Sequence, residues 1–159
     1  MPANLPPQIA SYPALDQAAM AAIAQALANI ARAGDVVYLW GDLGAGKSAF
    51  ARALLRALQV TEDIPSPTYT LAQHYPQAKI PALHADLYRL RSAAEAEELG
   101  LAELALDHIL LIEWPDRLDG LWQDTALHVV LDFGALPDSR RMDVHGDNDW
   151  AGRWATIKA

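Results

Sequence analysis

Residues 41–48 read GDLGAGKS and match the phosphate-binding pattern G-x-x-x-x-G-K-[ST]. The apolar run Val36–Trp40 precedes them, and Phe50, Leu54 and Leu58 follow at helical spacing. Glycines allow the backbone to curl so that several N–H groups point at phosphate oxygens, and the start of a helix adds partial positive charge. The stretch therefore predicts a strand, a nucleotide-binding loop and a helix. The alternative is a glycine-rich turn with a surface lysine, which the flanking patterns disfavour.

Each part of this loop has an expected role. Lys47 can reach the β- and γ-phosphates of ATP or ADP, which also makes it a candidate catalytic residue, and Ser48 can offer its hydroxyl to Mg²⁺. The expected cofactors are therefore ATP or ADP, and Mg²⁺. The residues expected to surround the nucleotide are Gly41, Asp42, Leu43, Gly44, Ala45, Gly46, Lys47, Ser48 and Ala49.

Length and composition restrict the class of protein. The chain has 159 residues, 52% of them hydrophobic, which predicts one domain spanning 1–159. Every long apolar stretch is interrupted, and the N-terminus lacks the pattern of a signal peptide, so we expect no membrane association and a cytoplasmic location. The chain has no cysteine, which excludes disulfides and thiolate metal sites.

The charge of the chain argues against direct contact with nucleic acid. The formal net charge is −8, and the only lysines are Lys47, Lys79 and Lys158. Because nucleic-acid binding normally depends on Lys and Arg neutralising phosphates, any role around RNA is expected to run through a protein partner.

The remaining patterns predict an α/β fold: a P-loop NTPase domain with a mixed central sheet, parallel core strands, antiparallel hairpins and helices on both faces. Residues 1–13 read as an extended lead-in with an edge strand around Ile9–Tyr12, and residues 125–159 as a C-terminal hairpin and tail. The further expected elements are a helix from Asp16 to Gly34, antiparallel neighbours Thr68–Tyr75 and Ile80–Asp86, helices Ser92–Gly100 and Leu101–Leu106, a buried strand Ile109–Ile112, and a hairpin of Leu127–Phe133 and Arg141–His145 that closes the sheet.

Glu113 directly follows the apolar run Ile109–Ile112. In an open α/β sheet, ligands bind outside the carboxyl ends of the strands. A carboxylate at that position can hold Mg²⁺, directly or through water, or orient an attacking water. Many buried strands end in an acid, so Glu113 is a candidate for this role mainly because a phosphate-binding loop lies upstream in the chain.

Asp86 is the second acid at a strand end. It can approach the metal or the attacking water, or it can simply cap the turn that follows. Arg89 can pair with a phosphate, although an ordinary salt bridge is the simpler expectation. Thr68 lies where many P-loop proteins carry a segment that responds to the γ-phosphate, and it can equally be only the start of a strand.

Several other patterns are absent or uninformative. No Asn-Lys-x-Asp motif occurs, which disfavours a Ras-like GTPase. The five histidines show no H-E-x-x-H spacing and are interpreted as structural or surface residues. Trp114 can contact a nucleotide or a partner, although a tryptophan in the core is the more common case.

Five blocks together resemble the bacterial TsaE family, the ATPase of tRNA threonylcarbamoyladenosine biosynthesis. In chain order these blocks are Gly41–Ser48, Ser66–Leu71, His84–Leu90, Glu98–Leu101 and Ile112–Pro115. The resemblance implies a small cytoplasmic P-loop ATPase in the pathway that modifies adenosine 37 of tRNA. It also implies the transferase TsaD and its companion TsaB as partners, with ATP turnover supporting repeated cycles of the transferase.

The resemblance also implies roles for single residues. Lys47 and Ser48 match the phosphate and Mg²⁺ ligands, Asp86 matches an acid needed for turnover, and Glu113 matches the Mg²⁺-associated acid. Thr68 lies in the switch-like block. Two other classes stay open: a small P-loop kinase, and a non-catalytic module whose binding to partners depends on nucleotide.

Overall fold

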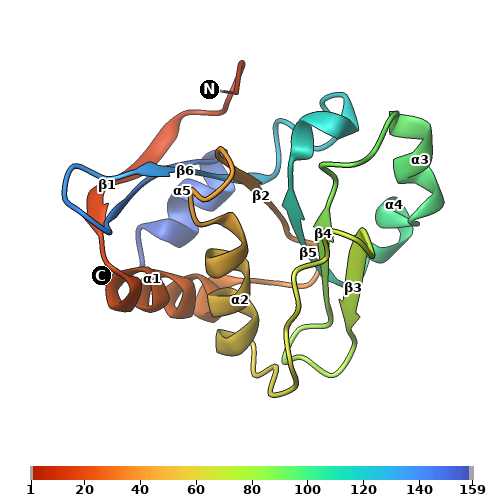
Figure 1. Ribbon diagram of the computed structural model, residues 1–159, viewed down its shortest axis with the longest axis horizontal. Coiled ribbons are helices and arrows are strands. Elements are labelled where there is room, and N and C mark those ends of the chain that lie inside the picture. Colours follow the sequence, from red (N-terminus) through yellow and green to blue (C-terminus); the bar gives the residue numbers. More distant parts are fainter. Residues whose placement is uncertain (1, 158–159) are drawn as a thin grey trace.

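A mixed sheet of seven strands forms the centre of residues 2–157, which are the residues that the computed structural model describes (Figure 1). The strand order is β1-β7-β6-β2-β5-β4-β3. The four central strands β6, β2, β5 and β4 run parallel, whereas β3, β7 and β1 join antiparallel, which confirms the predicted mixed sheet. The strands are β1 (Gln8–Leu15), β2 (Val36–Trp40), β3 (Ala72–Tyr75), β4 (Ala82–Asp86), β5 (Ile109–Glu113), β6 (Leu127–Phe133) and β7 (Arg140–His145).

Helices cover both faces of the sheet, as predicted. Strand β2 has an apolar surface on each face of the sheet. Val37 and Leu39 pack into the core that contains residues of α1, α2 and α5. Val36 and Tyr38 pack into the opposite core, which contains residues of α3 and α4. A strand buried on both faces is apolar throughout, because alternate side chains enter opposite cores. The helices are α1 (Gln17–Ile30), α2 (Lys47–Ala57), α3 (Ala93–Glu98), α4 (Leu101–Leu104), α5 (Asn148–Trp154) and the 3₁₀ turn η1 (Pro115–Leu118).

The two ends of the chain differ from their predicted form. The predicted edge strand in the lead-in is present as β1, but it extends to Leu15 and pairs with β7. The β6–β7 hairpin is therefore not the edge that closes the sheet. Met1 of the predicted lead-in and residues 158–159 of the predicted tail lie outside the described range.

The C-terminal tail contains a helix, α5, that the sequence prediction missed. The Asp147 carboxylate accepts a hydrogen bond from the backbone N–H of Trp150 at 3.0 Å and so caps the helix start. Trp150 and Trp154 are buried against the core, one helical turn apart. The cap residue and this spacing were the available signals.

Two predicted boundaries are wrong for reasons of backbone geometry. Helix α1 ends at Ile30, because Ala31 is extended; Gly34, with φ of 96°, belongs to the turn that enters β2. Strand β3 begins only at Ala72, because Leu71 has φ of 65°, which no strand accommodates. Residues 67–70 form a turn, and Leu71 is a bend between that turn and the strand. Helix α4 is also shorter than predicted and ends at Leu104. Within residues 2–157, no helix combines the length and apolar character needed to cross a membrane.

Candidate functional site

The predicted phosphate-binding loop connects β2 to α2, and it has glycine at two positions where a side chain would clash or strain the backbone. A Cβ on Gly41 would lie 2.6 Å from the carbonyl oxygen of Leu131, so no side chain fits there. Gly46, directly before α2, has φ of 108°, a conformation that residues with a side chain rarely adopt. The loop therefore closes tightly onto the start of α2, where backbone N–H groups are unpaired and can bind an anion.

Lys47 is buried and reaches back across the loop. Its ammonium donates hydrogen bonds to the carbonyl oxygens of Gly41 and of Asp42, the latter at 3.0 Å, and lies 4.3 Å from the ring centre of Trp114. Burial lowers the pKa of Lys47, and the negative charges of Glu113, Asp86 and Asp42 oppose that shift. The side chain thus lies among the groups that were predicted to act with it.

Ser48 and Glu113, the predicted Mg²⁺ ligands, are in contact. The Ser48 hydroxyl lies 3.0 and 3.1 Å from the two carboxylate oxygens of Glu113. They meet because β2 and β5 are parallel neighbours, so both strands end at the same edge of the sheet. A hydroxyl and a carboxylate are oxygen donors of the kind Mg²⁺ prefers, and Mg²⁺ commonly takes its other ligands from phosphates and water. The two side chains thus fit a Mg²⁺ bound with a nucleotide.

Asp86 lies beside Glu113 at the same sheet edge, in register across β4 and β5. One oxygen of Asp86 accepts from the hydroxyl of Thr68 at 3.2 Å, and the other accepts from the backbone N–H of Tyr88 at 3.0 Å. Asp86 therefore caps the turn that follows it, which was the simpler of its two predicted roles. It also contacts Thr68, the predicted switch residue. The hydroxyl of Ser66 lies 2.8 Å from that of Thr68.

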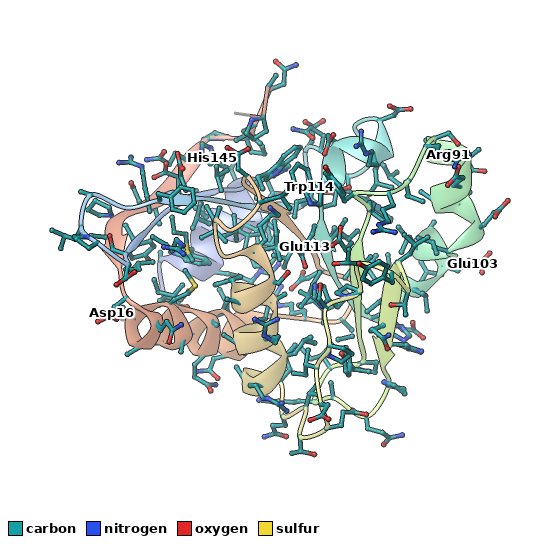
Figure 2. The ribbon with its side chains drawn as sticks, viewed as in Figure 1. Asp16, Arg91, Glu103, Glu113, Trp114 and His145 are labelled. Atoms are coloured by element: carbon teal, nitrogen blue, oxygen red, sulfur yellow. The ribbon has the colours of Figure 1, made fainter. Side chains whose placement is uncertain are left out.

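Trp114 adopts a left-handed backbone conformation, with φ of 58° and ψ of 54°. Such a conformation is an outlier for a bulky residue, and outliers of this kind concentrate at functional sites. Its ring packs against Tyr88, with ring centres 5.0 Å apart, and beneath the Lys47 ammonium. Figure 2 shows Glu113 and Trp114 between the top of α2 and β4.

Arg89 is the predicted residue that the fold does not bring to the phosphate loop. It is exposed, and its guanidinium carbon lies 4.4 Å from the ring centre of Tyr69. Within residues 2–157 Arg89 takes part in no ion pair, so the expected salt bridge is wrong and a cation–π contact replaces it.

His84 is a site residue that the sequence prediction missed. It is fully buried, and its Nε2 lies 2.7 Å from Oε2 of Glu113. With Glu113 ionised, Nε2–H donates to the carboxylate, while Nδ1 has no hydrogen-bond partner in the described part of the chain. The available signal was its position two residues before Asp86, because alternate residues of a strand share one face.

We expect the substitution His84→Leu to lower the free energy of unfolding by about 1–3 kcal/mol, because it removes a hydrogen bond from a buried carboxylate. Urea denaturation of the unchanged chain, H84L, E113Q and H84L/E113Q measures the coupling between the two sites. H84L should cost less stability when residue 113 is the uncharged glutamine. Equal costs in both backgrounds would contradict the coupling.

A cleft of about 700 Å³ lies beside the first residues of the phosphate loop, at the carboxyl ends of β2 and β6. Its lining includes Gly41, Trp40 and Trp114, together with four aspartates. Of its charged lining residues only Arg141 is basic, and Arg141 is paired with Asp143 at 3.1 Å. The cleft is therefore strongly acidic.

Comparisons with known proteins agree on one family. Residues 14–142 match the family model described as Threonylcarbamoyl adenosine biosynthesis protein TsaE. The tRNA threonylcarbamoyladenosine biosynthesis protein TsaE of Bacillus subtilis is 36% identical over 111 residues, which cover 69% of each chain. Its namesake from Haemophilus influenzae is 36% identical over 110 residues, covering 69% of this chain and 68% of that protein. A crystal structure of Bacillus subtilis YdiB is similar at a TM-score of 0.78, with 26% identity, over 96% of this chain and 95% of that one.

Proposed function

Because the chain belongs to the TsaE family of tRNA threonylcarbamoyladenosine biosynthesis, we propose that it is the Mg²⁺-dependent ATPase of that machinery. The observation that carries the proposal is the convergence of Lys47, Ser48, Asp86 and Glu113 at the start of α2. A loop that binds phosphates, a pair of oxygen donors for Mg²⁺ and a second carboxylate are the parts that in-line attack of water on a γ-phosphate requires.

In this proposal each side chain has a separate task. Lys47 gives up its hydrogen bonds to the loop carbonyls and binds the β- and γ-phosphates instead. Its positive charge then balances the negative charge that develops on the phosphates in the transition state. Ser48 and Glu113 would hold Mg²⁺, which would neutralise phosphate charge. Asp86, whose two oxygens accept hydrogen bonds from Thr68 and from the backbone of Tyr88, orients the attacking water and takes up its proton. His84 keeps the Glu113 carboxylate in place.

We propose further that the chain acts in the cytoplasm with TsaD and TsaB, and approaches tRNA only through them. The net charge of −8 supports this, because an acidic surface repels the phosphate backbone. The position of Arg89 supports a dependence on partners, since its guanidinium rests on Tyr69 instead of on the phosphate loop. Hydrolysis by the isolated chain is therefore expected to be slow.

The test is a measurement of phosphate release from ATP by the isolated chain and by the chain mixed with TsaB and TsaD. We expect release to need Mg²⁺, to stop with EDTA, and to rise about tenfold or more with the pair, as when a partner completes a phosphoryl-transfer site. Rapid turnover that the pair leaves unchanged would contradict the partner dependence. Phosphate that appears on an added metabolite instead of in solution would favour the kinase alternative.

A further inference from the structure

Two histidines from different segments of the chain face each other at the β3 edge of the sheet. Nε2 of His74 lies 2.8 Å from Nε2 of His108, and the centres of the two rings are 4.9 Å apart. His74 belongs to the edge strand β3, and His108 directly precedes β5. A hydrogen bond between these two nitrogens needs an N–H on one ring and a lone pair on the other.

Asp107 fixes which ring presents the lone pair. Its Oδ1 lies 2.5 Å from Nδ1 of His108. An ionised carboxylate only accepts hydrogen bonds, so Nδ1–H of His108 donates, and Nε2 of the neutral ring keeps its lone pair. A carboxylate behind an imidazole in this way is the usual partner of a histidine that binds a metal ion. His108 therefore directs a ligand nitrogen toward His74.

The fold holds both histidines in place. The backbone N–H of His108 donates to the carbonyl oxygen of Leu104 at 2.9 Å, and its own carbonyl oxygen accepts from Gly34 at 2.8 Å. His74 is in register with Leu83 in the ladder between β3 and β4. The His108 side chain is only 13% exposed, whereas His74 is exposed. One ring is thus fixed and the other faces solvent, so an ion in solution can reach the pair.

The pair is separate from the proposed nucleotide site. Strand β5 begins at Ile109, next to His108, and ends at Glu113, about 13 Å further along the strand. His74 is paired near the start of β4, whereas Asp86 ends that strand. The two histidines therefore lie toward the opposite end of these strands, and binding of a nucleotide does not explain their arrangement.

We infer that His74 and His108 form a binding site for a divalent transition-metal ion of the zinc type, with each ring contributing Nε2. Imidazole nitrogen is a good ligand for Zn²⁺, Cu²⁺ and Ni²⁺. Two imidazole nitrogens on one tetrahedral Zn²⁺ lie about 3.3 Å apart, so the present separation of 2.8 Å has to widen only slightly. The exposed His74 can make this shift, with its ring proton moving to Nδ1.

This site takes two ligands from the chain. Within residues 2–157 no group of three or more histidine, aspartate or glutamate side chains is arranged to hold a metal ion. Water or a second molecule therefore fills the other positions, and the ion exchanges with solution. A bound ion links the edge strand β3 to the start of β5 across β4, and it stabilises the folded chain because the unfolded chain does not hold the two rings together.

Titration of the untagged full chain with Zn²⁺ in excess Mg²⁺ tests the inference, by calorimetry and by ¹⁵N spectra of the histidine rings. We expect saturable binding that shifts the Nε2 signals of His74 and His108. His74→Gln should abolish this binding, because the glutamine amide can donate a hydrogen bond to His108 but its nitrogen has no lone pair for a metal. Asp107→Ala should weaken it about 10–100-fold, the usual range when the partner of a ligating histidine is lost.

The melting temperature gives an independent measurement on the same variants. Zn²⁺ should raise it for the unchanged chain and leave it unchanged for H74Q. His145→Ala is the matched control, because His145 ends β7, on the other side of the sheet from β3. H145A should bind Zn²⁺ as the unchanged chain does.

Three results would overturn the inference. The first is that H74Q binds Zn²⁺ as tightly as the unchanged chain, because the ion then lies elsewhere, for example at Ser48 and Glu113. The second is that Zn²⁺ binds without shifting the ring signals of His74 and His108. The third is that the unchanged chain binds no Zn²⁺, which leaves the pair as a hydrogen bond at the edge of the sheet. The ring spectra need only the unchanged chain, so they decide the question without relying on the folding of a variant.

Discussion

Replacing Lys47 with alanine is expected to abolish ATP turnover, with a fall in rate of at least about a hundredfold, the scale measured when one preorganised donor to a transition state is removed. Lys47 is the one ammonium at the loop in the described part of the chain, and it is already buried among Glu113, Asp86 and Asp42. Without it, these carboxylates face the incoming triphosphate without the ammonium that now lies among them. ATP affinity should therefore fall together with turnover.

Steady-state phosphate release and calorimetric titration with Mg-ATP measure the two effects of K47A. Lys79→Ala is the matched control, because Lys79 is exposed and lies outside the site. Lys79→Ala should change neither quantity. Normal ATP binding by K47A would mean that Lys47 does not bind the phosphates. Its only role would then be to donate hydrogen bonds to the loop carbonyls.

The substitution Asp86→Asn is expected to separate binding from chemistry. Asparagine has the shape of aspartate and can still form hydrogen bonds toward Thr68 and the backbone of Tyr88, so the turn should persist. It cannot take up a proton from water, and we expect kcat to fall by about 10²–10⁴, the range for loss of a general base. ATP affinity should stay the same or rise, because a negative charge near the phosphates is gone.

Single-turnover hydrolysis together with nucleotide titration measures these two effects of D86N. Asp63→Asn provides the control, since Asp63 is exposed and outside the site. The same variants distinguish the ATPase from a non-catalytic module. An ATPase predicts that both K47A and D86N lose support for the TsaD–TsaB transferase, whereas a module needs only Lys47. Full pathway output with D86N would therefore favour the module.

Most of the architecture was predictable from local patterns. Strand β2, the phosphate loop and α2 are contiguous in the chain, so their apolar run, glycines and helical spacing identify them without any long-range contact. The acids Asp86 and Glu113 could be proposed in the same way, because each ends an apolar strand. Boundaries failed where a residue adopted a conformation that its type disfavours, as at Leu71.

Contacts between distant segments were decided only by the folded chain. The sequence names Glu113, but the parallel register of β2, β4 and β5 is what places it against Ser48 and His84 and beside Asp86. The same holds for His74 and His108, which no motif marks and whose rings meet only because β4 pairs with both β3 and β5. A motif records residues that a ligand requires in one continuous stretch. The partners of those residues depend on which strands become neighbours, and that choice is made by burial over the whole sheet.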